Sequence, residues 1–157
     1  MLKTGQKVKG FSLNRADGSD FSLSEILGKK IIVLYFYPKD FTPGCTKEAC
    51  FFRDSYEVFL ENGAEVIGIS TDSVESHAKF AQKKELPFIL LSDPGGKVHE
   101  LYDVAPTLFG LLPGRVTYVI DLDGVVQNAF KSQVNINRHV NEALKVVQSL
   151  SQRSPKS

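Results

Sequence analysis

The chain has 157 residues, of which 42% are hydrophobic and 24% charged, with a formal net charge of +1. These values are ordinary for one globular domain, which at this length buries about two thirds of its unfolded surface and folds without a disulfide. They argue against a disordered chain, a nucleic-acid-binding protein and a membrane protein, because the basic residues are spread out and the longest apolar run, residues 31–37, is short.

The first thirty residues predict a small N-terminal β-hairpin. Residues 10–22 hold two short apolar stretches around Asp17-Gly18, a dipeptide that favours a tight turn. Residues 22–30 then predict a short helix or turn, with Ser24 as its cap and Gly28 as its end.

From residue 31 onwards, predicted strands and helices alternate, which indicates βαβ units and the α/β class. A turn at Asp123-Gly124 folds residues 121–130 back as a hairpin. We expect a single domain over residues 1–150 and a flexible tail over residues 151–157. The expected strands cover residues 31–37, 64–70, 87–93 and 115–121, and the expected helices cover residues 43–62, 73–85, 95–104 and 137–150.

Cys45 falls in the first turn of the predicted helix 43–62. Thr42 fits the N-cap, and Pro43 fits the first helical position, which tolerates its missing N–H. The free N–H groups and the positive dipole end of a first helical turn favour an anion, so we expect a reactive thiolate that accepts hydrogen bonds from the Thr42 hydroxyl and from nearby N–H groups. The alternative is that Cys45 is a small buried apolar residue, which is the usual state of a free cysteine.

A Cys-His hydrolase is less attractive as an interpretation of Cys45. In the sequence, none of His77, His99 and His139 stands beside an obvious orienting acid at a strand end. We therefore expect these histidines to be ordinary surface or core residues.

The spacing of Cys45 and Cys50, which are the two cysteines of the chain, limits their chemistry. In one regular helix their Cα atoms lie ~8.7 Å apart, and a disulfide requires less than about 7 Å. The spacing also differs from C-x-x-C and from the closely spaced ligand pairs of zinc sites. It favours a sequential reaction, in which Cys45 is oxidised to a sulfenic acid, the helix opens and Cys50 condenses with it.

The stretch PKDFTPGC contains Pro38, Thr42 and Cys45 in the P-x-x-x-T-x-x-C arrangement of the peroxiredoxins, and the chain resembles that family over residues 1–150. Cys50, five residues after Cys45, resembles the atypical 2-Cys subgroup called peroxiredoxin Q or bacterioferritin comigratory protein. The resemblance implies a thioredoxin-like fold, with a central mixed β-sheet flanked by helices and an N-terminal β-hairpin extension.

The resemblance also implies a thiol-specific peroxidase that reduces hydrogen peroxide and organic hydroperoxides to water and alcohols. Cys45 would be the peroxidatic cysteine and Cys50 the resolving one, and thioredoxin would reduce the Cys45–Cys50 disulfide. A general thiol-disulfide oxidoreductase and a non-enzymatic peroxide sensor are the alternatives. The absence of C-x-x-C argues against the first, and turnover would distinguish the second.

Four further residues receive roles from the resemblance. Thr42 would hydrogen-bond to the peroxide oxygens, and Pro38 would shield the thiolate from water. Arg115, at the start of RVTYVID, would stabilise the thiolate and orient peroxide, and Glu48 would hold the arginine. Aromatic residues crowd the motif, and some could form an apolar rim for alkyl or lipid hydroperoxides: Tyr37, Phe41, Phe51 and Phe52.

We expect no cofactor, no metal, no nucleic-acid or membrane partner, and a monomer. Because the first thirty residues lack an apolar signal core and no transit peptide is evident, the expected location is the cytoplasm of a bacterium or cyanobacterium, or a chloroplast in a processed mature form. Residues 106–115 resemble the cyanobacterial and plastid branch of the family.

Overall fold

A computed structural model of the chain describes residues 1–105 and 114–153. The strands are β1 (Ser12–Arg15), β2 (Asp20–Ser22), β3 (Ile31–Phe36), β4 (Ala64–Ser70), β5 (Ile89–Ser92), β6 (Val116–Ile120) and β7 (Val126–Lys131). The helices are α1 (Pro43–Glu61), α2 (Val74–Lys84), α3 (Lys97–Leu101) and α4 (Ile136–Arg153), and a 3-10 turn, η1, covers Leu23–Glu25.

Within the described residues, the strands form one mixed sheet in the order β2-β1-β5-β4-β3-β6-β7. The three central strands β5, β4 and β3 are parallel, as the βαβ pattern predicts, and β6 lies antiparallel to β3. The N-terminal hairpin β1–β2 joins the edge of the sheet beside β5. The α/β class, the mixed sheet and the N-terminal hairpin are therefore confirmed.

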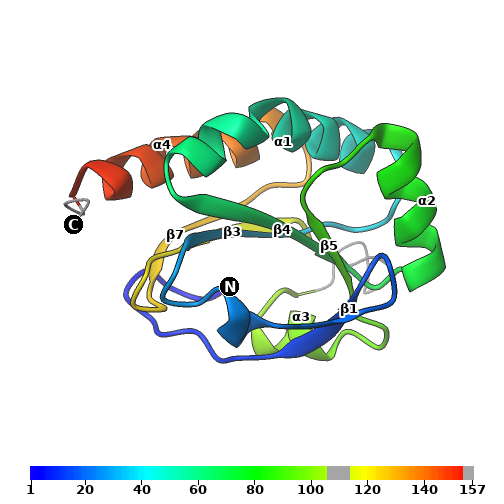
Figure 1. Cartoon of the computed structure of the whole chain (residues 1–157), viewed down its shortest axis with the longest axis horizontal. Helices are drawn as coiled ribbons and strands as arrows, with labels where there is room; N and C mark the ends of the chain where they lie inside the picture. Colours follow the sequence, from blue (N-terminus) through cyan, green and yellow to red (C-terminus); the bar gives the residue numbers. More distant parts are fainter. Residues whose placement is uncertain (106–113, 154–157) are drawn as a thin grey trace.

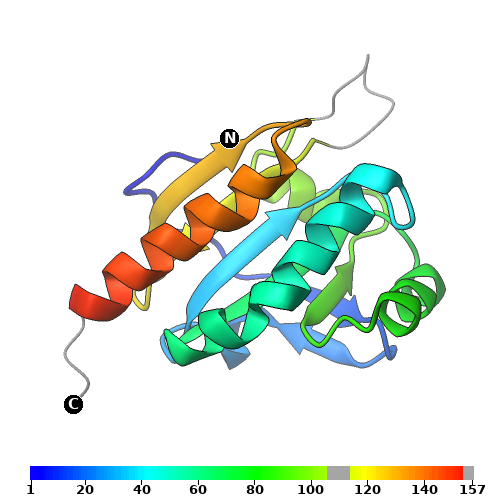
Figure 2. The ribbon, with the colours of Figure 1, turned by 90° about the horizontal axis from the view of Figure 1, so that it is seen from above.

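Helices cover both faces of the sheet. Figure 1 shows α1 and α4 on one face and α3 on the other, and the view from above in Figure 2 shows α1 and α4 side by side. Every residue of β3 is buried, because alternate side chains enter two separate hydrophobic clusters, Val33 and Tyr35 on the α1 face and Leu34 and Phe36 on the opposite face. A strand buried on both faces explains the unbroken apolar run at residues 31–37.

The ends of the predicted helices are mostly correct. Helix α1 begins at Pro43 with Thr42 as its N-cap, and Gly63, at φ 77°, follows the C-cap Asn62. Ser73 caps α2 by accepting a hydrogen bond from the N–H of Ser76 at 3.1 Å.

Several boundaries differ from the prediction, and strand β5 (Ile89–Ser92) is shorter than the predicted residues 87–93. Ser22, not Ser24, caps the turn before β3, because Glu25 reaches back to the Ser22 N–H at 2.8 Å and completes a capping box. Helix α3 is shorter than residues 95–104, since the left-handed Gly96 precedes it. Helix α4 continues to Arg153, past the predicted boundary at 150. Residues 154–157 lie outside the described residues. So do residues 106–113, which make up most of the segment that resembles the cyanobacterial and plastid branch.

No helix in the described parts of the chain combines the length and the apolar character that a bilayer span requires.

Candidate active site

Cys45 lies in the first turn of α1, at the carboxyl end of β3. The N-cap Thr42 has extended backbone angles (φ −74°, ψ 151°), and its carbonyl accepts the first helical hydrogen bond, from the Thr46 N–H at 2.8 Å. The local sequence therefore forms the predicted helix start, and it places the thiol among N–H groups that lack partners within the helix. Cys45 is only 1% exposed, and both cysteines are free thiols.

Arg115 approaches Cys45 from the neighbouring strand. The pairing of Val116 with Phe36 places the start of β6 beside the end of β3, so Arg115 lies next to the beginning of α1. Its Nη2 donates to Cys45 Sγ at 3.4 Å, and its Nη1 donates to Glu48 Oε1 at 2.5 Å. Arg115 is 5% exposed, so water screens its charge weakly. The structure thus brings together the three residues to which the resemblance assigns joint roles.

The buried carboxyl of Glu48 lies between two basic side chains. Its Oε2 lies 3.7 Å from His139 Nδ1 and has no hydrogen-bond donor among the described residues. Burial raises the pKa of Glu48 to about 7, although Arg115 opposes this shift. Burial would lower the pKa of Arg115, but the neighbouring charges of Glu48 and Cys45 raise it instead.

His139 is a member of this network that the sequence did not identify. Its Nε2 faces the carbonyl oxygen of Ser132 at 2.7 Å and therefore carries a proton. Its Nδ1 lies 2.8 Å from Thr117 Oγ1, and burial lowers the pKa of His139 to about 4. The neutral ring thus accepts from the Thr117 hydroxyl. A signal existed in the sequence, since His139 falls on the apolar face of α4 next to Val140.

Thr42 and Pro38 flank the loop before α1. The Thr42 hydroxyl donates to the Lys39 carbonyl at 2.7 Å, so the predicted hydrogen bond from Thr42 to Cys45 is absent from the described contacts. A local acceptor three residues upstream competes successfully for the hydroxyl. Pro38 is half-buried at the exit of β3. Neither residue has a structural contact that tests its predicted role toward peroxide.

Cys50 lies on the same uninterrupted helix as Cys45 and is half-buried. The geometry of a regular helix keeps the two Cα atoms ~8.7 Å apart, which is beyond the range of a disulfide. A Cys45–Cys50 bond therefore requires the first turns of α1 to unwind.

The aromatic residues around the motif serve mainly the core. Tyr37 and Phe52 are buried, and Phe51 is half-buried against the same hydrophobic cluster. Phe41 is 45% exposed and packs edge-on against Phe80 of α2, with ring centroids 5.1 Å apart. Of the four, Phe41 is the one whose side chain is exposed.

The expectation that no histidine has an orienting acid is wrong. Each histidine is buried near a carboxylate, in the pairs His77 with Asp40, His99 with Asp93 and His139 with Glu48. Sequence proximity could not reveal the partners of His77 and His139, which come from other elements, whereas Asp93 precedes His99 by 6 residues. Within the described residues, however, the donor to Cys45 Sγ is Arg115 and not a histidine, so the hydrolase interpretation gains no support.

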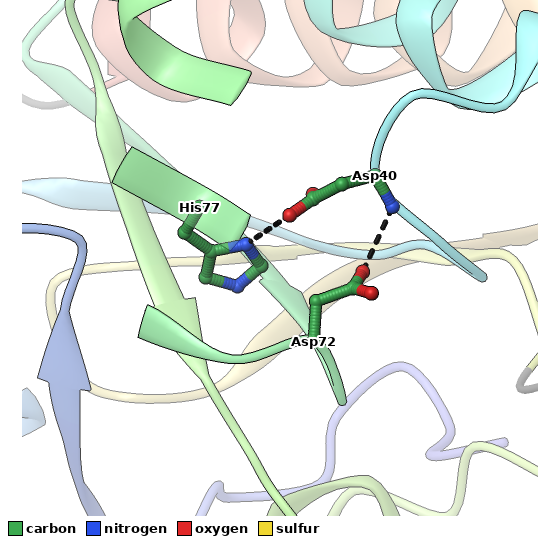
Figure 3. A group of neighbouring side chains, drawn as sticks. All are labelled: Asp40, Asp72 and His77. Carbon is green, nitrogen blue, oxygen red and sulfur yellow. Dashed lines mark hydrogen bonds and ion pairs between the residues drawn. The ribbon is translucent and has the colours of Figure 1, made fainter. Parts of the chain in front are cut away.

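One group of described residues has the composition of a metal site. Ligand atoms of Asp40, Asp72 and His77 all lie within 4.8 Å of one another, and Figure 3 shows how they face one another. Protein groups already occupy the Asp40 carboxylate: Tyr37 donates to Oδ1 at 2.6 Å, and Ser76 donates to Oδ2 at 2.9 Å. We therefore interpret the group as a closed hydrogen-bond network.

Comparison with known proteins places this site in a family. The family model described as AhpC/TSA matches residues 4–129. A chloroplastic peroxiredoxin Q from Sedum lineare is 56% identical over 146 residues, which cover 93% of this chain and 78% of the relative. The chloroplastic peroxiredoxin Q of Arabidopsis thaliana is 52% identical over 148 residues, covering 94% of this chain and 68% of the relative.

Solved structures agree with the sequence relatives. Peroxidoxin BcpB from Mycobacterium tuberculosis superposes with a TM-score of 0.89 at 40% identity, over 96% of this chain and 99% of that one. The bacterioferritin comigratory protein of Xanthomonas campestris gives a TM-score of 0.82 at 31% identity, over 90% of this chain and 92% of that one. The expected thioredoxin-like peroxiredoxin fold is therefore confirmed, and the chain belongs to the AhpC/TSA family, in its peroxiredoxin Q branch, and is a thiol peroxidase.

Proposed function

We propose that Cys45 is the peroxidatic cysteine of this peroxidase and that Cys50 resolves it. The observation that carries the proposal is the 3.4 Å contact from Arg115 Nη2 to the buried Cys45 Sγ at the start of a helix. A guanidinium and the positive end of a helix both favour the thiolate, which is the nucleophilic form of cysteine.

The first step is attack of the Cys45 thiolate on the distal oxygen of a peroxide. A sulfur–oxygen bond forms while the oxygen–oxygen bond breaks, and its electron pair leaves with the alkoxide or hydroxide, which takes up a proton. Sulfur is oxidised to a sulfenic acid and the peroxide is reduced. Arg115 and the first-turn N–H groups stabilise the negative charge that moves onto the leaving oxygen, and Glu48 holds the guanidinium in position.

In the second step, Cys50 attacks the sulfenic sulfur after the first turns of α1 unwind. The sulfur–sulfur bond replaces the sulfur–oxygen bond, and the hydroxyl leaves as water with the thiol proton. A dithiol of the thioredoxin kind then reduces the disulfide by exchange and is itself oxidised.

We assign supporting roles to Thr42 and Pro38. Thr42 would turn its hydroxyl from Lys39 to the bound peroxide, and Pro38 would limit access of water from the β3 side. The exposed ring of Phe41 offers an apolar edge to the entrance, which favours alkyl hydroperoxides as substrates beside hydrogen peroxide. Alkyl peroxide reduction is reported for the Xanthomonas campestris relative, which supports this choice.

We further infer a monomeric, single-domain enzyme that needs no cofactor and no nucleic-acid or membrane partner. For its location, the chloroplastic relatives support the chloroplast over the bacterial cytoplasm.

The test is NADPH oxidation coupled through thioredoxin and thioredoxin reductase, with hydrogen peroxide and an alkyl hydroperoxide as substrates. Cys45→Ser should abolish peroxide reduction. Cys50→Ser should still form a sulfenic acid, which mass spectrometry detects, but should lose thioredoxin-dependent turnover. Full activity of Cys45→Ser would refute the assignment, and a general disulfide reductase would reduce protein disulfides without consuming peroxide.

A further inference from the structure

The loop that leads into the active-site helix is anchored at Asp40. This residue is 4% exposed and lies five positions before Cys45, between β3 and α1. Figure 3 shows its side chain directed at His77 of α2 and its backbone nitrogen directed at Asp72, in the connection from β4 to α2. Asp40 Oδ2 lies 2.6 Å from His77 Nδ1, and the Asp40 N–H donates to Asp72 Oδ2 at 2.8 Å.

The anchor extends into the core through each of these partners. His77 Nε2 lies 2.9 Å from the Leu91 carbonyl oxygen of β5, which ties the ring to the sheet. The Ser70 hydroxyl donates to Asp72 Oδ2 at 2.7 Å. The side chain of Asp40 is therefore attached to α2 and, through His77, to β5, while its backbone is attached to the half-buried Asp72 in the connection from β4 to α2.

A second anchor lies beyond Cys50. Arg53 Nη1 donates to the Lys84 carbonyl at the end of α2 at 2.7 Å. The neighbouring Phe52 is fully buried and stacks on Tyr35, with ring centroids 4.5 Å apart. Asp40 and Arg53 thus form hydrogen bonds to the two ends of α2. Both cysteines lie on the segment between Asp40 and Arg53.

The same segment must rearrange when the disulfide closes. The sulfenic acid on Cys45 has to leave Arg115, and the turns that separate it from Cys50 have to unwind. The hydrogen bonds of Asp40, just before the helix, oppose this movement, because they hold the first turn of α1 where Arg115 can reach it.

We propose that Asp40 is a positioning residue that sets the balance between the two chemical steps of the peroxidase. Its ties to Ser76 and His77 hold Cys45 in the folded geometry that attacks peroxide, at the expense of the unwound geometry that closes the disulfide. The proposal rests on the Cys45–Cys50 cycle described above. Asp40 touches neither cysteine in the described contacts, so it acts through the loop and not on the reacting atoms.

The two steps can be measured separately by rapid mixing with one equivalent of hydrogen peroxide, acid quenching and intact-mass analysis. Asp40→Asn weakens the tie to His77 and Ser76 while keeping the size of the side chain. We expect it to slow formation of the Cys45 sulfenic acid and to speed disulfide closure, each by roughly three- to tenfold, which corresponds to the loss of about one ordinary hydrogen bond.

The matched control is Asp93→Asn. Asp93 is equally buried, and its Oδ2 lies 2.6 Å from His99 Nδ1, but it caps α3 and has no contact with the loop before α1 among the described hydrogen bonds. We expect it to lower the free energy of unfolding in urea to a similar extent and to leave both rates within about twofold of the wild type.

A milder variant allows the test to be made even if Asp40→Asn does not fold. Ser76→Ala removes the 2.9 Å hydrogen bond to Asp40 Oδ2 and should shift both rates in the same directions, by a smaller factor. If the ratio of the rate of disulfide closure to the rate of sulfenic acid formation is the same in Asp40→Asn and Asp93→Asn, the inference is overturned. If Asp40→Asn does not fold, an unchanged ratio in Ser76→Ala would overturn it. A wild-type protein that forms no Cys45–Cys50 bond would instead refute the proposed cycle itself.

Discussion

The guanidinium of Arg115 bridges Cys45 and Glu48, with one terminal nitrogen 3.4 Å from the sulfur and the other 2.5 Å from the carboxyl oxygen. Cys45 and Glu48 are neighbours on α1, Arg115 lies 70 and 67 positions further along the chain, and all three are buried. Because one planar group serves both partners, a change that moves it affects the thiol and the carboxyl together.

Replacing Arg115 with lysine should cost activity although it keeps the positive charge. A single ammonium cannot reach both Cys45 and Glu48 with the geometry of the guanidinium fork. We expect kcat/KM for hydrogen peroxide to fall by roughly 10²- to 10³-fold. Arg138→Lys, at an exposed ion pair on α4, is the control and should be neutral. Wild-type kcat/KM in Arg115→Lys would argue against any role of the fork.

Gly44→Ala should separate activity from stability. An alanine Cβ at this position would lie 3.2 Å from Arg115 Nη2, the nitrogen that donates to the thiol, so the guanidinium has to move by a few tenths of an ångström. Alanine favours a helix over glycine by up to about 1 kcal/mol, so the free energy of unfolding should be unchanged or higher. We expect kcat/KM to fall roughly three- to tenfold. Gly10→Ala meets no atom within 4 Å and serves as the control. A loss of stability without a loss of rate would contradict the prediction.

Glu48 should make the protein less stable as the pH rises from about 4.5 to about 7. Burial raises its pKa from 4.5 to about 7, so in this window the native state holds a proton that the unfolded chain has released. This contribution to stability is complete below pH 4.5 and is lost as the pH passes about 7. Urea unfolding at a series of pH values should show that Glu48→Gln lacks this decline.

His139 acts in the opposite direction at lower pH. Its pKa is lowered from 6.5 to about 4, so its contribution is present above pH 6.5 and is lost as the pH falls through about 4. His139→Asn should remove that loss. The control Glu142→Gln, which removes a partly exposed carboxylate of α4, should keep the wild-type profile. Parallel profiles for Glu48→Gln and the wild type would refute the assignment to Glu48.

Glu85→Gly should stabilise the protein without changing its activity. Glu85 ends α2 in the left-handed region, at φ 54° and ψ 50°, where a side chain with a Cβ is strained. We expect a gain of about 0.5 to 1 kcal/mol in the free energy of unfolding. Glu85→Ala keeps the Cβ and should bring no such gain. Equal stability of the glycine and alanine variants would show that the strain is absent.

The local sequence determined the helix start that holds Cys45 and most of the strand and helix positions. Thr42, Pro43 and Gly63 define the limits of α1 through capping and turn preferences that act over a few residues. The distance between the two cysteines follows from the same helix. Where the prediction failed, as with Ser22 in place of Ser24, two polar residues competed for one cap.

Only the tertiary structure decided which distant side chains meet. The resemblance to the peroxiredoxins supplied Arg115 and Glu48, but the pairing of β6 with β3 is what brings the arginine to the thiol. The apolar face of α4 marked His139 as buried but did not name its partners, and nothing local paired Asp40 with His77, because these partners lie on other elements and meet only when the sheet and helices pack. Buried polar groups must find partners wherever the fold places them, and local propensity carries no information about that choice.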